Sequence, residues 1–271
     1  MQAVPPIRAT DDGSIWIDVG SAKKRSRQST RAPKNKAPRS RRDIRGASTQ
    51  KVCDMDFSIP AADVLQPFSA EQFGALNPRQ REALATAAVL RALFDPTGGE
   101  IGSRDLAAHH EAGHAVVAKA LGYSIGSVRV GLHPTLRVWT GYTTHHLRGE
   151  SSGVCVPEEE PDVAERIATV TLAGFVAEAR LKPLHPTSSM DERFRAAIAC
   201  FALDDAAGCN AGTTLQRVID RVCRLIECNL AAFDAIVDLL SRERRPNTKQ
   251  LAQALRPIKL SSEFARHEAA V

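Results

Sequence analysis

The sequence predicts a mainly α-helical protein with one short β-hairpin. Three observations favour this fold class. Apolar residues recur at helical spacing through most of the chain after residue 77, and prolines and glycines divide that part into segments of helix length. Residues 127–143 instead alternate between apolar and polar with a period of two, which is typical of paired strands. With 271 residues, 43% of them hydrophobic, the chain is long enough for one enzyme-sized core.

The first part of the chain differs from the rest in charge. Residues 1–51 hold 13 Lys and Arg against 4 Asp, whereas the remainder is mildly acidic. Residues 21–51 are rich in Lys, Arg, Ser and Pro and nearly free of large apolar side chains, so we expect a disordered basic arm. Ile15, Trp16, Ile17 and Val19 ahead of it could form a short strand or a docking motif. The predicted division is a basic arm (1–51), a helical lead-in segment (52–102), a main domain (103–256) and a C-terminal tail (257–271).

Helix signals begin in the lead-in segment. Ser69 and Gln72 have the spacing of a capping box, and Asn77-Pro78 reads as an N-cap followed by a first-turn proline. The expected helix covers residues 78–94 and ends before the Pro and Gly residues at 96–99. A second helix should begin near Ser103 and stop near Gly122.

The hairpin and the remaining helices follow in order. We expect strands at residues 127–132 and 136–143, joined by the turn His133-Pro134-Thr135. A helix should open at Pro161 and run to about Leu181. The last third is predicted to be helical at residues 191–203, 214–230 and 231–241, with a short helix after the Asn247-Thr248 cap.

The expected location is the cytoplasm. The six cysteines form no C-x-x-C pair, which favours reduced, packing cysteines, and the N-terminus lacks the apolar core of a secretion signal. The most apolar stretch, residues 167–177, is much shorter than the roughly 20 residues of a membrane-crossing helix. We therefore predict no membrane span.

The main functional signal is the H-E-x-x-H motif at residues 110–114. Residues four apart on a helix project from the same face, so His110 and His114 can bind one Zn²⁺ ion. Glu111 beside them can serve as the base that activates a water molecule for attack on a peptide carbonyl. Gly113 costs stability inside a helix, which suggests that another backbone or a substrate approaches there. The simpler alternative is a solvated helix face carrying two histidines.

The run His110-Glu111-Ala112-Gly113-His114-Ala115-Val116-Val117 resembles the active-site helix of the FtsH-type peptidases, the protease half of the membrane-bound AAA proteases. Residues 127–144, 171–178 and 235–255 are similar to the strand pair, the Leu-Gly-Gly-x-x-Ala-Glu segment and the closing helices of that family. The resemblance covers residues 103–256. It implies a helical FtsH-like zinc peptidase domain with a short β-hairpin after the active-site helix.

The resemblance also implies that an aspartate at the start of a later helix is the third zinc ligand, and Asp191 is its best match. Asp191 could instead serve only as a favourable charge at a helix N-terminus. Glu178 matches a family position and is expected to support the fold or the ligands. His109 points away from the His110 and His114 face and is expected to pack. Other candidates for the third ligand are Glu192, Asp204, His133, His145, His146 and His185.

The first functional hypothesis is a zinc metalloendopeptidase that acts on protein or peptide substrates. Because the sequence contains no G-x-x-x-x-G-K-[ST] motif, it would cleave flexible chains unaided or use a separate ATP-dependent unfoldase. The ring assembly of the resembled family makes a homo-oligomer conceivable. A second hypothesis is a peptide-binding or regulatory protein on a peptidase-like scaffold whose third ligand has failed. A third is weak, nonspecific nucleic-acid contact through the 12 basic residues of 21–51.

Overall fold

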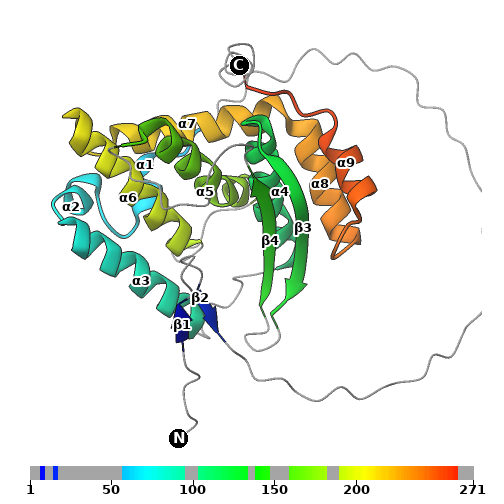
Figure 1. The fold of residues 1–271 in the computed structure, drawn as a ribbon, viewed down its shortest axis with the longest axis horizontal. Helices are drawn as coiled ribbons and strands as arrows, with labels where there is room; N and C mark the ends of the chain where they lie inside the picture. Colours follow the sequence, from blue (N-terminus) through cyan, green and yellow to red (C-terminus); the bar gives the residue numbers. More distant parts are fainter. Residues whose placement is uncertain are drawn as a thin grey trace, which may run out of the picture. The chain divides into compact units, whose positions relative to one another are not determined.

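A computed structural model describes residues 7–9, 15–17, 57–94, 103–133, 138–146, 159–181 and 189–261 (Figure 1). The chain divides into two compact units, residues 1–54 and 55–271. In the first unit, β1 (Ile7–Ala9) and β2 (Ile15–Ile17) pair antiparallel, which confirms the strand predicted around Trp16. The basic arm predicted at residues 21–51 lies outside the described residues.

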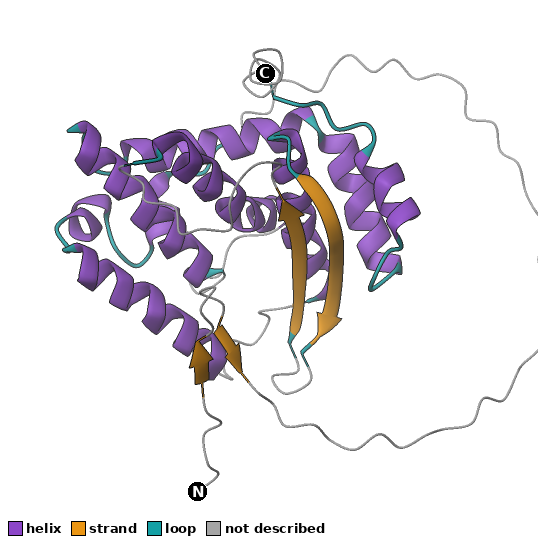
Figure 2. Cartoon of the chain, viewed as in Figure 1, coloured by secondary structure: helices purple, strands orange, loops and turns teal. Residues whose placement is uncertain are grey.

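The second unit is mainly helical, with one two-stranded antiparallel sheet, as predicted (Figure 2). Within the described segments, none of the helices combines the length and apolarity needed to cross a bilayer. Its elements are α1 (Ala61–Leu65), α2 (Ala70–Gly74), α3 (Pro78–Phe94), α4 (Arg104–Ala120), β3 (Ser124–Leu132), β4 (Trp139–His146), α5 (Pro161–Leu181), α6 (Met190–Ala207), α7 (Thr213–Cys228), α8 (Leu230–Arg242) and α9 (Thr248–Leu255).

Local capping signals set the helix starts where the sequence predicts them. Ser69 and Gln72 form the expected capping box at α2, and Asn247 and Gln250 form another at α9. The Ser103 side chain accepts a hydrogen bond from the Leu106 N–H at the start of α4. Because these short polar side chains satisfy backbone N–H groups that a helix leaves free, they fix the first turns.

The hairpin is longer and shifted relative to the prediction. β3 begins at Ser124 instead of residue 127, and β4 covers Trp139–His146 instead of residues 136–143. An irregularity between Ile125 and Ser127 adds one residue to β3 and lets pairing continue to Ser124 and His146. Of the predicted turn, only His133 is described, and its N–H bonds the Val138 carbonyl.

Helix α4 lies at the centre of the unit and packs against α5, α8 and both strands. Its residues Ala108, Ala112, Ala115 and Val116 are fully buried. A Cβ at Gly113 would lie 2.4 Å from the Ala173 carbonyl oxygen of α5. The glycine therefore allows the two helices to approach closely, as its place inside a helix suggested.

The lead-in helices belong to the same compact unit as α4, so residue 102 is not a boundary of that unit. One link is the buried guanidinium of Arg193 on α6, which donates from Nε to the Val64 carbonyl (2.8 Å) and from Nη2 to the Gln66 carbonyl (2.9 Å). The predicted tail also begins inside the unit, because the Ser261 N–H bonds the Ala120 carbonyl at 2.8 Å.

Candidate metal centre

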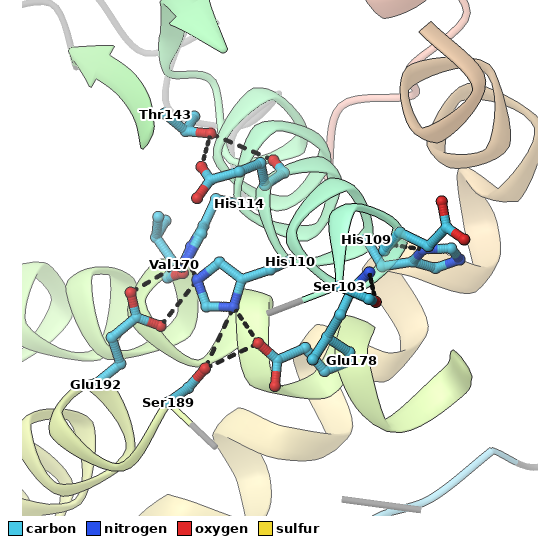
Figure 3. A network of polar contacts seen from close by, with 12 residues as sticks. Ser103, His109, His110, His114, Thr143, Val170, Glu178, Ser189 and Glu192 are labelled. Carbon is cyan, nitrogen blue, oxygen red and sulfur yellow. Dashed lines mark hydrogen bonds and ion pairs between the residues drawn. The ribbon is translucent and has the colours of Figure 1, made fainter. Parts of the chain in front are cut away.

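Helix α4 brings His110 and His114 together as the motif predicts (Figure 3). Their Nε2 atoms lie 2.9 Å apart, on the side of α4 that faces α5 and α6. Both rings are largely buried, with side chains 15% and 12% exposed. The alternative of a solvated helix face is therefore wrong.

Helix α5 fixes which nitrogen of each ring faces inward. The Nδ1 of His110 lies 2.7 Å from Oε1 of Glu178, and the Nδ1 of His114 lies 2.8 Å from the Val170 carbonyl oxygen. Carboxylate and carbonyl oxygens can only accept, so each Nδ1 carries the proton. Two neutral rings held in this way direct the lone pairs of both Nε2 atoms into the same space, as metal-binding histidines do.

A carboxylate completes the group, and it comes from the first turn of α6. Oε2 of Glu192 lies 3.3 Å from Nε2 of His110, and Oε1 lies 3.5 Å from Nε2 of His114. Among the described residues, His110, His114 and Glu192 form the one group of three side chains close enough to share a metal ion. Glu192 was an alternative in the sequence prediction.

The first choice, Asp191, is not the carboxylate that the structure places beside the histidines. Successive helix residues are rotated by about 100°, so only one of two neighbours can face a given point. The turn at Ser189, whose backbone is left-handed (φ 46°), sets the start of α6 so that Glu192 faces α4. Asp191 is partly buried nearby, and burial followed by the charge of Glu192 raises its pKa.

Two small residues, Ser189 and Gly174, allow the contact between Glu178 and the His110 ring. The Ser189 hydroxyl donates to Oε1 of Glu178 (3.0 Å), so the start of α6 is tied to the carboxylate that orients His110. A Cβ at Gly174 would lie 2.4 Å from Cε1 of His110, so the ring needs a glycine there. Val170, Gly174 and Glu178 are four residues apart and thus share one face of α5. The roles of Ser189 and Gly174 were not predicted from the sequence. The position of Gly174 four residues before Glu178 could have indicated that it lies on the same face of α5.

Glu111 lies beside the group and not in it, as predicted. Its side chain is held by Thr143 of β4, whose hydroxyl donates to Oε2 at 2.5 Å. Only 4% of the residue is exposed. Burial raises the pKa of Glu111 despite the opposing influence of His110, His114 and Thr143. A carboxylate with a raised pKa is well suited to take up and return a proton near neutral pH.

Gly141 offers a direct test of this placement. A Cβ at Gly141 would lie 2.2 Å from Cγ of Glu111, so we expect Gly141→Ala to displace the Glu111 carboxylate while sparing the histidines. For the peptide hydrolysis proposed below, the expected result is a loss of activity of about 100-fold with zinc content unchanged. Gly131→Ala in β3 is the matched control, because a Cβ there meets nothing within 4 Å. Equal activity of the two variants would contradict the placement of Glu111.

The other candidate ligands have different surroundings. His109 packs edge-on against Phe233 with ring centroids 5.7 Å apart, which confirms its predicted packing role. The Asp204 carboxylate accepts from the N–H groups of Gly212 and Thr214 and so supports the start of α7. His145 stacks edge-on against Tyr123. His133 and His146 likewise lie outside the three-residue group, and His185 is outside the described residues.

The residues present fit a zinc ion. Two imidazole nitrogens and one carboxylate are a common ligand set of catalytic zinc, and donors bound to one tetrahedral ion are roughly 3.4 Å apart. The separations here are 2.9, 3.3 and 3.5 Å. Oε2 of Glu192 is buried and accepts no hydrogen bond within the described part of the chain. Such a group of converging donor atoms could hold a metal ion.

The protonation equilibria also favour positive charge at this point. Burial alone would lower the pKa of His110, but the negative charge of Glu192 and the contacts with Glu178 outweigh it and raise the pKa well above its usual value. The pKa of His114 is raised in the same way, against burial, by Glu192. The pKa of Glu192 is strongly lowered, because the two imidazoles overcome the effect of its burial.

Comparison with known proteins gives no independent identification. No protein-family model matches the chain, and no curated protein matches it in a sequence search.

Proposed function

We propose that this protein is a zinc-dependent metalloendopeptidase. The observation that supports it most is the convergence of His110 Nε2, His114 Nε2 and the Glu192 carboxylate, with the buried Glu111 directly beside them. A metal with three protein ligands and one open position is the arrangement of catalytic zinc, whereas structural zinc has four protein ligands. Each residue of the site has a separate task in peptide hydrolysis.

A bound zinc ion would supply a Lewis acid that makes a water molecule more acidic and polarises the substrate carbonyl. Glu111 takes the proton of the attacking water and passes it to the leaving amine. The Thr143 hydroxyl holds one oxygen of Glu111 and leaves the other for this transfer. Glu178 and the Val170 carbonyl keep both imidazoles in the tautomer that binds a metal.

The free edge of β4 is the proposed binding site for the substrate backbone. The Val130 N–H bonds the Arg244 carbonyl, on the side of β3 away from β4, so Val130 and its partner Gly141 form a non-hydrogen-bonded pair. In such a pair the backbone groups of both residues point away from the partner strand, and those of Gly141 therefore point to the outer side of β4. The same alternation applies to Trp139 and Thr143. Among the described residues no other strand pairs with this edge, so a peptide can add to it as a third strand.

The motif similarity to FtsH-type peptidases supports the same function. The similar segments include the active-site helix, the following hairpin and the α5 segment that here provides Gly174 and Glu178. We propose protein or peptide substrates accordingly, with an unfoldase as a separate partner for folded ones. The carboxylate of Glu192 in place of the aspartate is a departure from that family's pattern.

Metal removal tests the proposal. Treatment with 1,10-phenanthroline followed by dialysis should abolish cleavage of unfolded casein, and one equivalent of zinc should restore it. Because zinc binds the folded state, its return should also raise the free energy of unfolding, by about 2.7 kcal/mol when free zinc is 100-fold above Kd. Casein cleavage that survives complete metal removal would refute the proposal, as would a zinc-loaded protein that cleaves no unfolded chain.

A further inference from the structure

The start of α6, which carries the candidate ligand Glu192, has no side-chain cap of its own. The residue before the helix, Ser189, has a left-handed backbone, and its side chain makes no hydrogen bond to the first turn. The Ser189 hydroxyl is instead directed to Glu178 on α5 (Figure 3). Because no local cap fixes the first turn, its position depends on contacts with other elements.

One such contact is made by the residue next to Glu192. Arg193 is fully buried, and its guanidinium donates from Nε to the Val64 carbonyl at 2.8 Å and from Nη2 to the Gln66 carbonyl at 2.9 Å. Val64 is in the last turn of α1 and Gln66 is its C-cap, where a helix leaves carbonyl groups without intrahelical partners. A single side chain thus satisfies the end of α1 and holds the first turn of α6.

Arg193 also packs against α5, the helix that orients both histidines. Its guanidinium carbon lies 4.9 Å from the centroid of the Phe175 ring. Burial lowers the pKa of Arg193 to about 10, against the opposing charges of Glu178 and Asp63, so the side chain remains a cation at neutral pH. The guanidinium therefore contacts both α1 and α5, and its charge acts on the carboxylate that holds His110.

We propose that Arg193 is a positioning residue that couples the docking of α1 to metal binding by Glu192. The inference rests on the metal site of the proposed peptidase and adds α1 to the elements that support it. Glu192 and Arg193 are consecutive residues of one helix, so a shift of α6 that separates Arg193 from α1 also moves the Glu192 carboxylate. A movement of about 1 Å would be enough to weaken binding, because metal–ligand distances tolerate only about 0.2 Å.

Arg81 provides a matched control, because it makes the same kind of contact at the other end of α6. It is also buried, donates from Nε and Nη2 to two carbonyls at the end of α2 at 3.3 and 2.8 Å, and lies 5.2 Å from the centroid of the Phe201 ring. Its partner on α6 is Asp205, about 18 Å along the helix from Arg193. Arg81→Met should therefore destabilise the fold much as Arg193→Met does, without reaching the metal site.

Zinc affinity is measured in the full-length protein by competition with a chromophoric chelator, at a temperature where the metal-free variants are folded by circular dichroism. We expect Arg193→Met to weaken zinc binding by about 10 to 100-fold, the usual effect of losing a residue that supports a metal ligand, and Arg81→Met to change it by less than about threefold. Arg193→Lys, which keeps the charge and one donor, should give an intermediate affinity. If a methionine variant does not fold, Arg193→Lys and Arg81→Lys make the same comparison.

Coupling is reciprocal, so zinc should also slow hydrogen exchange in residues 61–68 of the wild-type protein. This protection should be lost in Arg193→Met and kept in Arg81→Met. Equal zinc affinities of the two arginine variants, or protection of α1 that survives Arg193→Met, would overturn the inference. Neither measurement involves cleavage, so zinc-dependent protection of α1 in a wild-type protein that cleaves no peptide would refute the peptidase proposal and leave the coupling intact.

Discussion

Glu111→Gln is expected to lower kcat for peptide hydrolysis by about 10² to 10⁴-fold, the usual contribution of a general base. The amide has the same shape as the carboxylate and can still accept the hydrogen bond from Thr143. It cannot take a proton from water. Because Glu111 is not one of the three converging side chains, zinc content should remain at the wild-type level.

The measurement combines zinc analysis of the purified protein with initial rates of cleavage of a fluorogenic peptide. Glu71→Gln is the control, because Glu71 is an exposed residue of α2 with an ordinary environment. A Glu111→Gln protein that loses its zinc would show that Glu111 supports the metal and not the proton transfer. A variant of full activity would favour the alternative that the scaffold only binds peptides.

The helices could be predicted well from the sequence, because their ends depend on local chemistry. Ser69, Ser103 and Asn247 cap the helices that they were expected to cap. The spacing of His110 and His114 was sufficient to place both on one face of α4, because four residues always make about one turn. These features need no information from distant parts of the chain.

The third ligand was not predictable in the same way. Asp191 and Glu192 are adjacent and both acidic, and which one faces α4 depends on the left-handed turn at Ser189. That turn is held by Glu178 on another helix, a contact that local sequence does not contain. The contact of Thr143 with Glu111 was missed for a related reason, since it requires the register and position of β4 against α4.

The clearest contrast for the metal itself is Glu192→Gln against Asp191→Asn. Each change replaces one carboxylate with an amide of the same shape, and both residues are in the first turn of α6, so any effect on the helix dipole is matched. Glu192→Gln should weaken zinc binding by more than about 100-fold. Mutating a residue that only hydrogen-bonds to a metal ligand already lowers metal affinity by about 10 to 100-fold, and the loss of a ligand should have a larger effect. Asp191→Asn should change the affinity by less than about threefold, in keeping with a carboxylate that binds no metal.

Zinc affinity is measured for both variants by competition with a chromophoric chelator, and casein cleavage is followed at limiting zinc. The variant that fails to hold zinc should also be the one that fails to cleave, because the same ion is required for both. If Asp191→Asn loses zinc and Glu192→Gln keeps it, the first turn of α6 must be rotated by about one residue from the arrangement described. The aspartate expected from the FtsH-type resemblance would then be the ligand, and Glu192 would be its neighbour.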